Sequence, residues 1–408
     1  MNKVNILAPV GNFETLMAAV KAGADEIYFG TKNLNMRSTG ANNFEITELE
    51  KISKICQLKN IKTWVTVNTV VYDEELDLVR KILMEIKKTK MNGIIAADWA
   101  VIKEAKKLGI EVCASTQMSV SNLETVKILS EWVDRIVLAR ELTLEQIKKI
   151  VKGIKKENIK GPGGKLIEIE VFGHGAMCVG VSGRCYMSLY TSNLSANRGE
   201  CVQMCRRKYE VKEIDSGKEM VINNNLVMSR SDLCTIGLLE ELVKSGIKTI
   251  KIEGRARSAD YVDRVVRTYK KGLELIQKKK YGGKEKKKLL KDLKTVFNRG
   301  FSTGFFMGRS TDEWAEGENS QATESKKLMG KINHFYPKIK VAEVFLGKLR
   351  VKNGEEYIII SPKTGILRGK FFDIKMDGNI LTFQVGQRVW KNDKLFVVEK
   401  NEKESSGK

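Results

Sequence analysis

Short apolar stretches alternate with longer amphipathic stretches over the first 255 residues, and this alternation limits the possible folds more than any other feature. The amphipathic stretches carry apolar residues three and four apart, as helices do. Repeated strand and helix units predict a parallel sheet. The expected strands are Val4–Pro9, Glu26–Gly30, Lys62–Thr69, Asn92–Asp98, Glu111–Thr116, Arg135–Ala139, Ile167–His174 and Lys248–Gly254.

Eight such units favour an α/β fold in which the strands close into a (β/α)8, TIM-like barrel over residues 1–310. An open, doubly wound sheet is the competing interpretation. No GxGxxG motif follows the first strand, however, and eight strands fit a closed barrel better. A long helix, Ala259–Gln277, is expected after the last barrel strand.

The connection after the seventh strand is about seventy residues long, far longer than the usual link in such a fold. We call residues 175–235 the cysteine insertion, because they hold most of the chain's seven cysteines. Functional groups of these barrels lie where strands end. We therefore expect the insertion to cover the catalytic face of the barrel.

The chain changes character after a lysine-rich run and a polar stretch. We expect a linker at 311–329, followed by strand alternation with DG and NG turns over 330–400. This pattern predicts a small antiparallel β-barrel. The last residues, 401–408, are polar and are expected to be disordered.

No run of eighteen apolar residues and no signal-peptide pattern occurs, so we expect a cytoplasmic protein with no membrane partner. Disulfides seldom persist in that compartment, which leaves metal binding or redox chemistry for clustered cysteines. The formal charge of +22 suits a polyanion such as RNA. A lysine-rich, merely solvated surface would give the same excess. The sequence does not address the oligomeric state.

The cysteine insertion carries four soft metal ligands, Cys178, Cys185, Cys201 and Cys205. Four thiolates satisfy either one iron–sulfur cluster or one zinc ion. The spacing lacks the two CxxC pairs of a zinc ribbon and therefore favours a 4Fe-4S cluster. Cys234, expected where the last barrel helix begins, is the alternative fourth ligand to Cys205. The cysteines at 56 and 113 are expected to be core residues.

Polar residues at the expected strand ends predict a pocket on the same face of the barrel. Arg140 and Arg255 are expected to grip a small carboxylate, because guanidinium groups bind carboxylates through two hydrogen bonds. His174 and Glu253 are candidate proton carriers. The expected substrate-binding residues are Asn68, Asp98, Gln117, Glu141 and Arg184. Any of these side chains could instead cap a helix or pair with a neighbour.

Several segments carry a family resemblance. They are EVFGHGAMCVGVSGRCYMS (170–188), the following RGECVQMCRR, MSRSDLC (228–234), IKIEGRARSADYV (250–262) and VFNRGFSTG (296–304). With them the chain resembles the collagenase-like peptidase family U32. The resemblance runs from residue 4 to about residue 400 and includes the small C-terminal unit.

This resemblance implies an iron–sulfur protein acting in the hydroxylation of RNA bases, either a tRNA wobble uridine or a ribosomal RNA cytidine, or of the ubiquinone ring. It also implies that prephenate replaces molecular oxygen in the tRNA branch. The C-terminal unit favours the branch that acts on RNA. The same family carries the older description of protease or collagenase, a hydrolase.

The residues supply little machinery for a hydrolase. Only His174 and His334 are present, with no HExxH zinc pair and no GxSxG nucleophile turn. A peptidase stays an alternative on the resemblance alone. A further alternative is a non-enzymatic RNA-binding protein whose insertion holds a structural metal.

Overall fold

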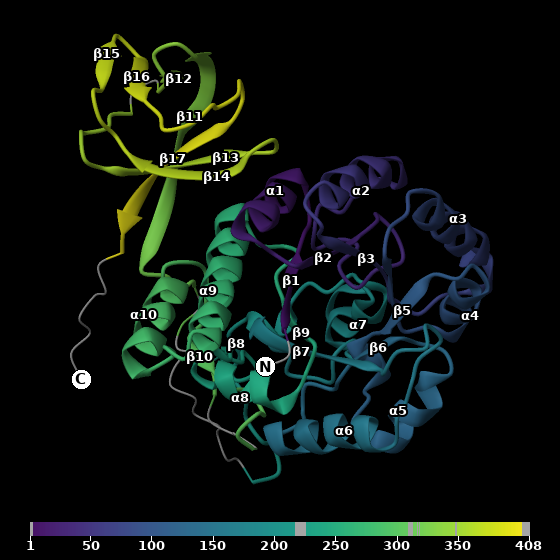
Figure 1. Ribbon diagram of the computed structural model, residues 1–408. Coiled ribbons are helices and arrows are strands. Elements are labelled where there is room, and N and C mark those ends of the chain that lie inside the picture. Colours follow the sequence, from purple (N-terminus) through teal and green to yellow (C-terminus); the bar gives the residue numbers. More distant parts are fainter. Residues whose placement is uncertain are drawn as a thin grey trace.

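The computed structural model describes residues 3–216, 226–308, 313–315, 317, 319–346 and 349–401. Figure 1 shows a barrel surrounded by helices, with a smaller sheet beside it. The helices are α1 (Phe13–Ala22), α2 (Leu49–Gln57), α3 (Leu76–Lys88), α4 (Trp99–Lys107), α5 (Leu123–Ser130), α6 (Leu144–Lys156), α7 (Met187–Ser192), α8 (Leu239–Ser245), α9 (Ala259–Gln277) and α10 (Gly283–Lys294). The strands of the larger unit are β1 (Asn5–Pro9), β2 (Glu26–Gly30), β3 (Lys62–Val67), β4 (Gly93–Ala96), β5 (Glu111–Ala114), β6 (Arg135–Val137), β7 (Glu168–Gly175), β8 (Asp232–Cys234), β9 (Thr249–Ile252) and β10 (Phe301–Ser302).

The barrel is closed by parallel pairing. The strands follow one another from β1 to β7, and β9 pairs with both β7 and β1. Each expected strand is present, with its ends within two residues of the expected ones. The (β/α)8 prediction is confirmed, and the open doubly wound sheet is excluded because the ring of hydrogen bonds has no free edge.

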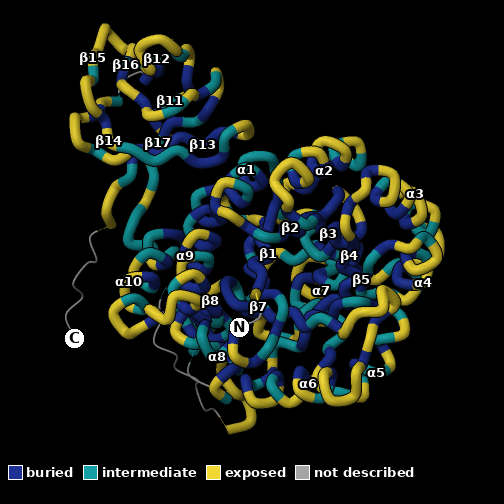
Figure 2. The backbone as a smooth tube through the Cα atoms, in the orientation of Figure 1, coloured by how far each residue is buried: buried dark blue, intermediate teal, exposed yellow. Residues whose placement is uncertain are grey.

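The outer helices form because their apolar residues gather on one side. In α6 the Thr143 and Gln146 side chains form a capping box at the start. Ile147, Ile150 and Ile154 then recur at helical spacing and are buried against the barrel. Burial of each such side chain contributes about 1.5–3 kcal/mol. Figure 2 shows this pattern around the ring, with buried strands inside and exposed outer turns.

The barrel interior combines an apolar cluster with a buried charged network. The apolar cluster includes Trp64 and Cys113. Arg135 is fully buried, and its guanidinium binds the Glu26 carboxylate through two hydrogen bonds of 2.6 and 3.2 Å. The Lys251 ammonium lies 3.0 Å from Glu170. Buried charges require such pairing, so these residues fix one packing of the interior.

Two strands extend the sheet beyond the barrel. β8 runs antiparallel to β7, with His174 opposite Cys234, and β10 runs parallel to β8. Cys234 was expected at the start of the last barrel helix. It lies instead inside β8 and is buried, because this additional strand ends the insertion before α8 begins.

The C-terminal unit is a separate antiparallel sheet, as expected. Its strands are β11 (Glu324–Tyr336), β12 (Val341–Phe345), β13 (Glu356–Ser361), β14 (Gly365–Lys370), β15 (Lys375–Asp377), β16 (Ile380–Gln384) and β17 (Lys394–Lys400), in the order β14-β13-β17-β11-β12-β16-β15. They enclose their own hydrophobic core. The long strand β11 begins at Glu324, inside the expected linker. Residues 309–312, 316, 318 and 402–408, which include parts of the expected linker and tail, lie outside the described residues.

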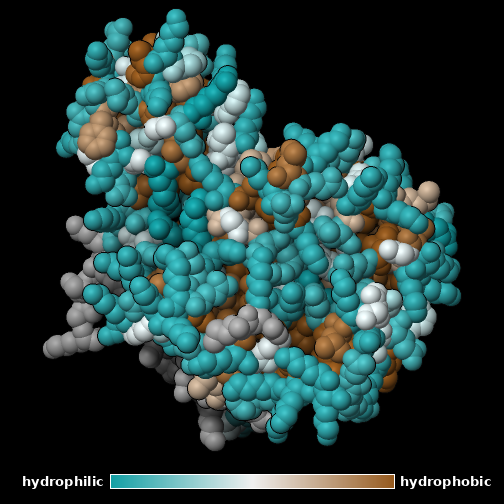
Figure 3. All heavy atoms as spheres, in the orientation of Figure 1, coloured by the Kyte–Doolittle hydropathy of each residue, from teal (hydrophilic) through white to brown (hydrophobic). Residues whose placement is uncertain are grey.

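The two units touch through a small apolar contact. Ala18 of α1 and Ala259 of α9 pack against Ile358, Ile360 and Ile366 of the C-terminal sheet. Figure 1 shows β14 beside α1. The surface facing the viewer in Figure 3 is mainly hydrophilic, with hydrophobic residues in small separate areas. Within the described part of the chain, every helix is too short or too polar to cross a membrane.

Candidate functional site

A small cavity of about 100 Å³ opens at the carboxyl ends of the barrel strands. Its walls come from β2, β3, β7 and β9, from the turns after β5 and β6, and from the cysteine insertion. The lining residues are Tyr28, Met36, Arg37, Thr66, Asn68, Ser115, Thr116, Gln117, Arg140, Phe172, Cys178, Ser182, Gly183, Lys251, Glu253 and Arg255. The insertion therefore covers this face of the barrel, as the sequence predicts.

Five of the nine polar residues proposed from the sequence are brought together here. These are Asn68, Gln117, Arg140, Glu253 and Arg255. Their convergence follows from the fold, because the ends of parallel barrel strands meet at one rim.

One carboxylate in the cavity is already paired. Nη2 of Arg37 lies 3.2 Å from Oε1 of Glu253. Burial would raise the pKa of Glu253, but the positive charges of Arg37, Arg257 and Arg140 lower it overall. Glu253 is therefore ionised at neutral pH, and it can accept a proton or a hydrogen bond rather than donate one.

Two guanidinium groups lining the cavity have no carboxylate bound to them among the described residues. Arg140 donates from Nη2 to the Ala176 carbonyl at 3.0 Å, lies over the Phe172 ring, and has a buried Nε without a hydrogen-bond partner. Arg255 donates to Asn35 and Thr66, at 2.9 and 3.1 Å. Burial lowers its pKa to about 10, so it remains charged at neutral pH. The cavity thus has an excess of positive charge.

A row of neutral side chains, Asn68, Ser115 and Gln117, forms another part of the wall. The Asn68 amide donates to Ser115 Oγ at 3.2 Å and to Gln117 Oε1 at 3.4 Å, and its oxygen accepts from the Met36 amide. The Ser115 hydroxyl also binds Gln117 Oε1. These bonds hold the row in place and leave it able to recognise a polar ligand.

His174 does not line the cavity. Its ring is 1% exposed and packs near the rings of Tyr261, Tyr269 and Phe301. Burial lowers its pKa to about 3. Nδ1 lies 3.4 Å from the Tyr269 hydroxyl. This environment suits a neutral structural histidine better than a proton carrier in contact with substrate.

Three other residues proposed from the sequence also lie outside the cavity. Asp98 caps α4, accepting from the Ala100 amide at 2.8 Å, and also binds the Val71 amide. Glu141 and Arg184 have exposed side chains. The strand-end rule selects positions at the rim, but it does not specify which side chains point inward.

One arginine fastens the cysteine insertion to the barrel, and another holds the insertion together. The Arg198 guanidinium pairs with Glu75 of the barrel unit and lies over the Tyr72 ring. Within the insertion, Arg206 donates to the carbonyl oxygens of Met177 and Arg230, at 2.5 and 2.6 Å. Arg206 thus joins the start, the middle and the end of the insertion beside the cysteines.

Close backbone approach also positions the insertion. Gly199 has φ +94°, and a Cβ there would lie 2.1 Å from the Asn35 carbonyl. A Cβ on Gly183 would lie 2.4 Å from Gln117. Only glycine fits both positions.

Four of the five cysteines in the insertion, Cys178, Cys185, Cys201 and Cys205, are unpaired thiols close to one another. Burial raises the pKa of Cys205, Arg206 lowers it, and the charges of Cys178, Cys201 and Cys185 raise it further. In the part of the chain that the structure describes, no three metal-ligating side chains converge on one ion position. Four thiols are a soft donor set of the kind that binds either an iron–sulfur cluster or zinc.

The two candidates for the fourth ligand have different surroundings. Burial raises the pKa of Cys234 to about 11, and Ile236, Tyr269, Asp232 and Lys294 also act on this pKa. The pKa of Cys205 is instead affected by the charges of Cys178, Cys201 and Cys185. The cysteines at 56 and 113 are buried, as expected of core residues.

Sequence reasoning missed Arg37 and Lys251. Arg37 belongs to the loop after β2, where no strand-end position identifies it; the density of polar residues in NLNMRSTGANNF is the available signal. Lys251 lies within β9 and points into the barrel, where it pairs with Glu170. A lysine inside an otherwise apolar strand could have indicated it.

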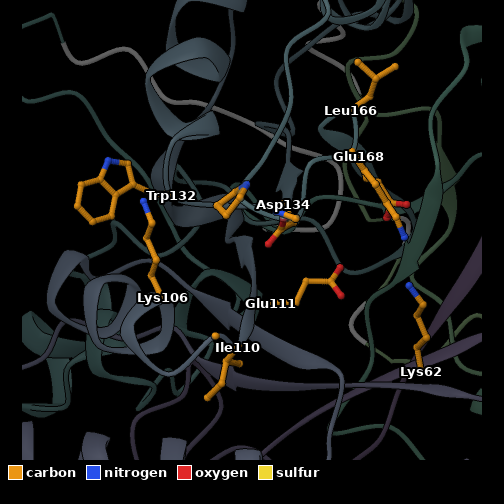
Figure 4. A pocket seen from close by; sticks show the side chains of 12 residues that line it. Lys62, Lys106, Ile110, Glu111, Trp132, Asp134, Leu166 and Glu168 are labelled. Atoms are coloured by element: carbon orange, nitrogen blue, oxygen red, sulfur yellow. The ribbon is translucent and has the colours of Figure 1, made fainter.

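A larger hollow of about 320 Å³ lies at the opposite end of the barrel, where strands begin (Figure 4). Several of its polar side chains are already bound to neighbouring groups. Glu168 binds Arg135, Asp134 accepts from the Gly163 amide at 2.8 Å, and Lys106 lies over the Trp132 ring. In barrels of this kind this end contributes to stability, and the opposite end carries function. We therefore place the candidate site at the smaller, cationic cavity.

Comparison with known proteins agrees with the resemblance. The model of peptidase family U32 matches residues 11–316. A collagenase of Porphyromonas gingivalis is 41% identical, covering 98% of this chain and 99% of its own. A tRNA hydroxylation protein of Bacillus subtilis is 33% identical, covering 79% and 75%. The 23S rRNA 5-hydroxycytidine synthase of Escherichia coli is 26% identical, covering 96% of this chain and 57% of its own. The chain belongs to peptidase family U32.

Proposed function

We propose that this protein is an iron–sulfur enzyme that hydroxylates a pyrimidine base of tRNA or ribosomal RNA in the cytoplasm. The observation that carries the proposal is the position of Cys178, which belongs to the cysteine group and also lines the cationic cavity. The names of the hydroxylation proteins among the relatives supply the reaction class.

Cys178, Cys185, Cys201 and Cys205 would hold the cluster. When bound, a 4Fe-4S cluster supplies redox or Lewis-acid chemistry. The positive charges around the thiols support this assignment, because they offset the negative charge of thiolate ligands. Arg37 and Arg140 feel the charge of Cys178, and Arg206 lies beside Cys205.

The oxygen donor in this proposal is a small carboxylate metabolite, such as prephenate. The unpaired guanidinium groups of Arg140 and Arg255 support it, since each can bind a carboxylate. The cavity is too small, at about 100 Å³, for a nucleotide and a donor together. In the proposal the donor therefore occupies the cavity while the base approaches from its mouth.

The chain's own groups would then act by binding and orientation. The Arg140 and Arg255 guanidinium groups hold the donor, and the row from Asn68 to Gln117 orients its polar groups. Hydroxylation replaces a C–H bond of the base by C–O–H. In the proposed step the donor would transfer one oxygen atom to the ring carbon, its own bond to that oxygen would break, and the donor would be reduced by two electrons. Glu253, kept ionised by Arg37, is the base within the cavity that would take the proton from the ring carbon and return it to the new oxygen.

The basic surface supports RNA as the partner. Helix α10 and the residues before it carry nine lysines between positions 278 and 294, against two acidic residues. Lys287, Lys291 and Lys294 line a hollow with Lys400 of the C-terminal sheet. Lysines that have no acidic partner are suited to RNA phosphates.

A peptidase is the second candidate, favoured by the names of relatives such as the Porphyromonas gingivalis protein. It would need an activated nucleophile or a metal-bound water. The residue closest to the site with a suitable ring, His174, is enclosed by aromatic side chains and has its pKa lowered to about 3. The hydroxylase proposal explains more of the site.

The decisive experiment is deletion of the gene, followed by mass analysis of nucleosides from total tRNA and ribosomal RNA. We expect one modified pyrimidine to lose the mass of one oxygen atom. The wild-type gene should restore it, and Cys178→Ser should not. An unchanged nucleoside profile, in a strain without a second copy, would contradict the proposal. Cleavage of gelatin by the purified protein would favour the peptidase instead.

A further inference from the structure

Two tyrosines of the cysteine insertion are exposed to solvent. Tyr190 is 93% exposed and Tyr186 is 69% exposed. Tyr186 directly precedes α7, and Tyr190 lies within it. The Tyr190 amide donates to the Tyr186 carbonyl at 2.9 Å, so the two residues are one helical turn apart and occupy the same side of the helix.

Most tyrosines of the described residues are buried or half-buried. The two other exposed tyrosines both have partners: Tyr72 lies under the Arg198 guanidinium, and Tyr336 binds Glu343. Packing within the chain therefore accounts for Tyr72 and Tyr336. It does not account for Tyr186 and Tyr190.

The location of the pair connects it with the site. Tyr186 follows Cys185, and the cavity-lining residues Ser182 and Gly183 lie just before it in the chain. Figure 1 shows α7 inside the ring of outer helices, over the barrel. Arg184, which is exposed and lies two residues before Tyr186, adds a positive charge near the pair.

We propose that Tyr186 and Tyr190 form a stacking platform for unpaired RNA bases at the mouth of the cavity. This inference rests on the proposed function and narrows its substrate to single-stranded or looped RNA. Aromatic rings bind bases by stacking only where the bases are not already stacked in a helix. An adjacent arginine binds the phosphate backbone. A base inside a duplex could not reach a cavity of this size.

The test compares binding of two labelled RNAs, an unpaired oligouridine and a fully paired duplex, by fluorescence anisotropy. Wild-type protein should bind the unpaired RNA more tightly. Replacing both tyrosines, Y186A with Y190A, should weaken binding of the unpaired RNA by roughly 10-fold or more. Binding of the duplex should change little. Phenylalanine at both positions should retain binding, because stacking needs the ring and not the hydroxyl.

Leu58→Ala provides the control, since Leu58 is 82% exposed on the outside of the barrel. It should not alter either affinity. Thermal melting and the visible spectrum report whether the tyrosine variants fold and keep their cofactor. Equal binding of unpaired RNA by wild type and the double alanine variant would overturn the inference. A change in oligomeric state instead of RNA affinity would also overturn it. Absence of RNA binding by the wild type would count against the proposed function itself.

Discussion

Arg37 and Glu253 form an ion pair in the lining of the cavity, with 3.2 Å between Nη2 and Oε1, and this pair determines which positive charges remain for a ligand. Lys251 is likewise paired, with Glu170. Arg140 and Arg255 are left to bind an anion. Because Arg140 belongs to neither of these ion pairs, its removal should weaken binding of the donor without disturbing the barrel.

We expect Arg140→Ala to abolish the modification while leaving the cluster and RNA binding intact. Loss of charge-assisted hydrogen bonds should cost about 1.5–3 kcal/mol in donor binding, or roughly 10- to 100-fold in affinity. Nucleoside mass analysis measures the product, and anisotropy measures RNA binding. Arg80→Ala is the matched control, because Arg80 pairs with Asp77 on the outer surface. Unchanged modification in Arg140→Ala would remove this residue from the site.

The cysteine variants should divide into two groups. Serine at 178, 185, 201 or 205 should remove the brown colour and about four irons per chain from anaerobically purified protein. Cys234→Ser and Cys56→Ser should keep both, because Cys234 is buried in β8, where Ile236 and Tyr269 are its hydrogen-bond neighbours, and Cys56 is in the core. Iron and sulfide analysis measures the result. Cluster loss in Cys234→Ser with retention in Cys205→Ser would reverse the assignment, and stoichiometric zinc in the wild type would refute the cluster.

The buried His174 predicts a particular dependence of stability on pH. Its folded pKa of about 3 lies below the ordinary value of 6.5, so the unfolded chain binds a proton that the folded chain does not. The unfolding free energy should therefore fall as pH drops from 6.5 towards 3, by about 1.4 kcal/mol between pH 7.5 and 5.5 from this residue. His174→Phe should lack this part of the fall. Urea unfolding at the two pH values measures it, and equal falls in both proteins would contradict the assignment.

Charge reversal on α10 should weaken RNA binding in a salt-dependent way. Lys287→Glu, Lys291→Glu and Lys294→Glu together remove three ammonium groups from the hollow beside the C-terminal sheet. Each lost phosphate contact should reduce the slope of log affinity against log salt by about 0.7 to 0.9. Binding is measured between low and physiological salt.

The control for that experiment reverses lysines that already have acidic partners. Lys54 pairs with Glu50, and Lys244 pairs with Glu240. Their reversal should leave the salt slope unchanged. If the α10 variant and this control behave alike, the hollow is not a specific RNA contact.

The sequence predicted the barrel well because closure by eight parallel strands depends on a repeated pattern. Each unit contributes an apolar run and an amphipathic helix, and these are local features. The same reasoning placed Arg140 and Glu253 in the cavity from their positions after strands. It failed for His174, whose enclosure by Tyr261, Tyr269 and Phe301 depends on residues far apart in the chain.

The other differences between the predictions and the structure also arise from contacts between residues far apart in the chain. Arg37 enters the cavity through a loop whose path depends on contacts with the insertion, such as the close approach of Gly199 to Asn35. The start of β11 at Glu324 depends on pairing with Lys400, at the other end of the C-terminal unit. Neither relationship leaves a periodic signal in the sequence.

The packing of α1 against β14 has a consequence for synthesis on the ribosome. Ala18 belongs to the first helix, whereas Ile366, which covers it, is made nearly 350 residues later. At the usual rate of about 5–20 residues per second, this surface of the first helix stays uncovered for roughly 20 to 70 seconds. During that time a nascent chain presents an apolar area that a chaperone or another nascent chain can bind. Completion of the last domain therefore also ends the period in which the first helix is open to the wrong partner.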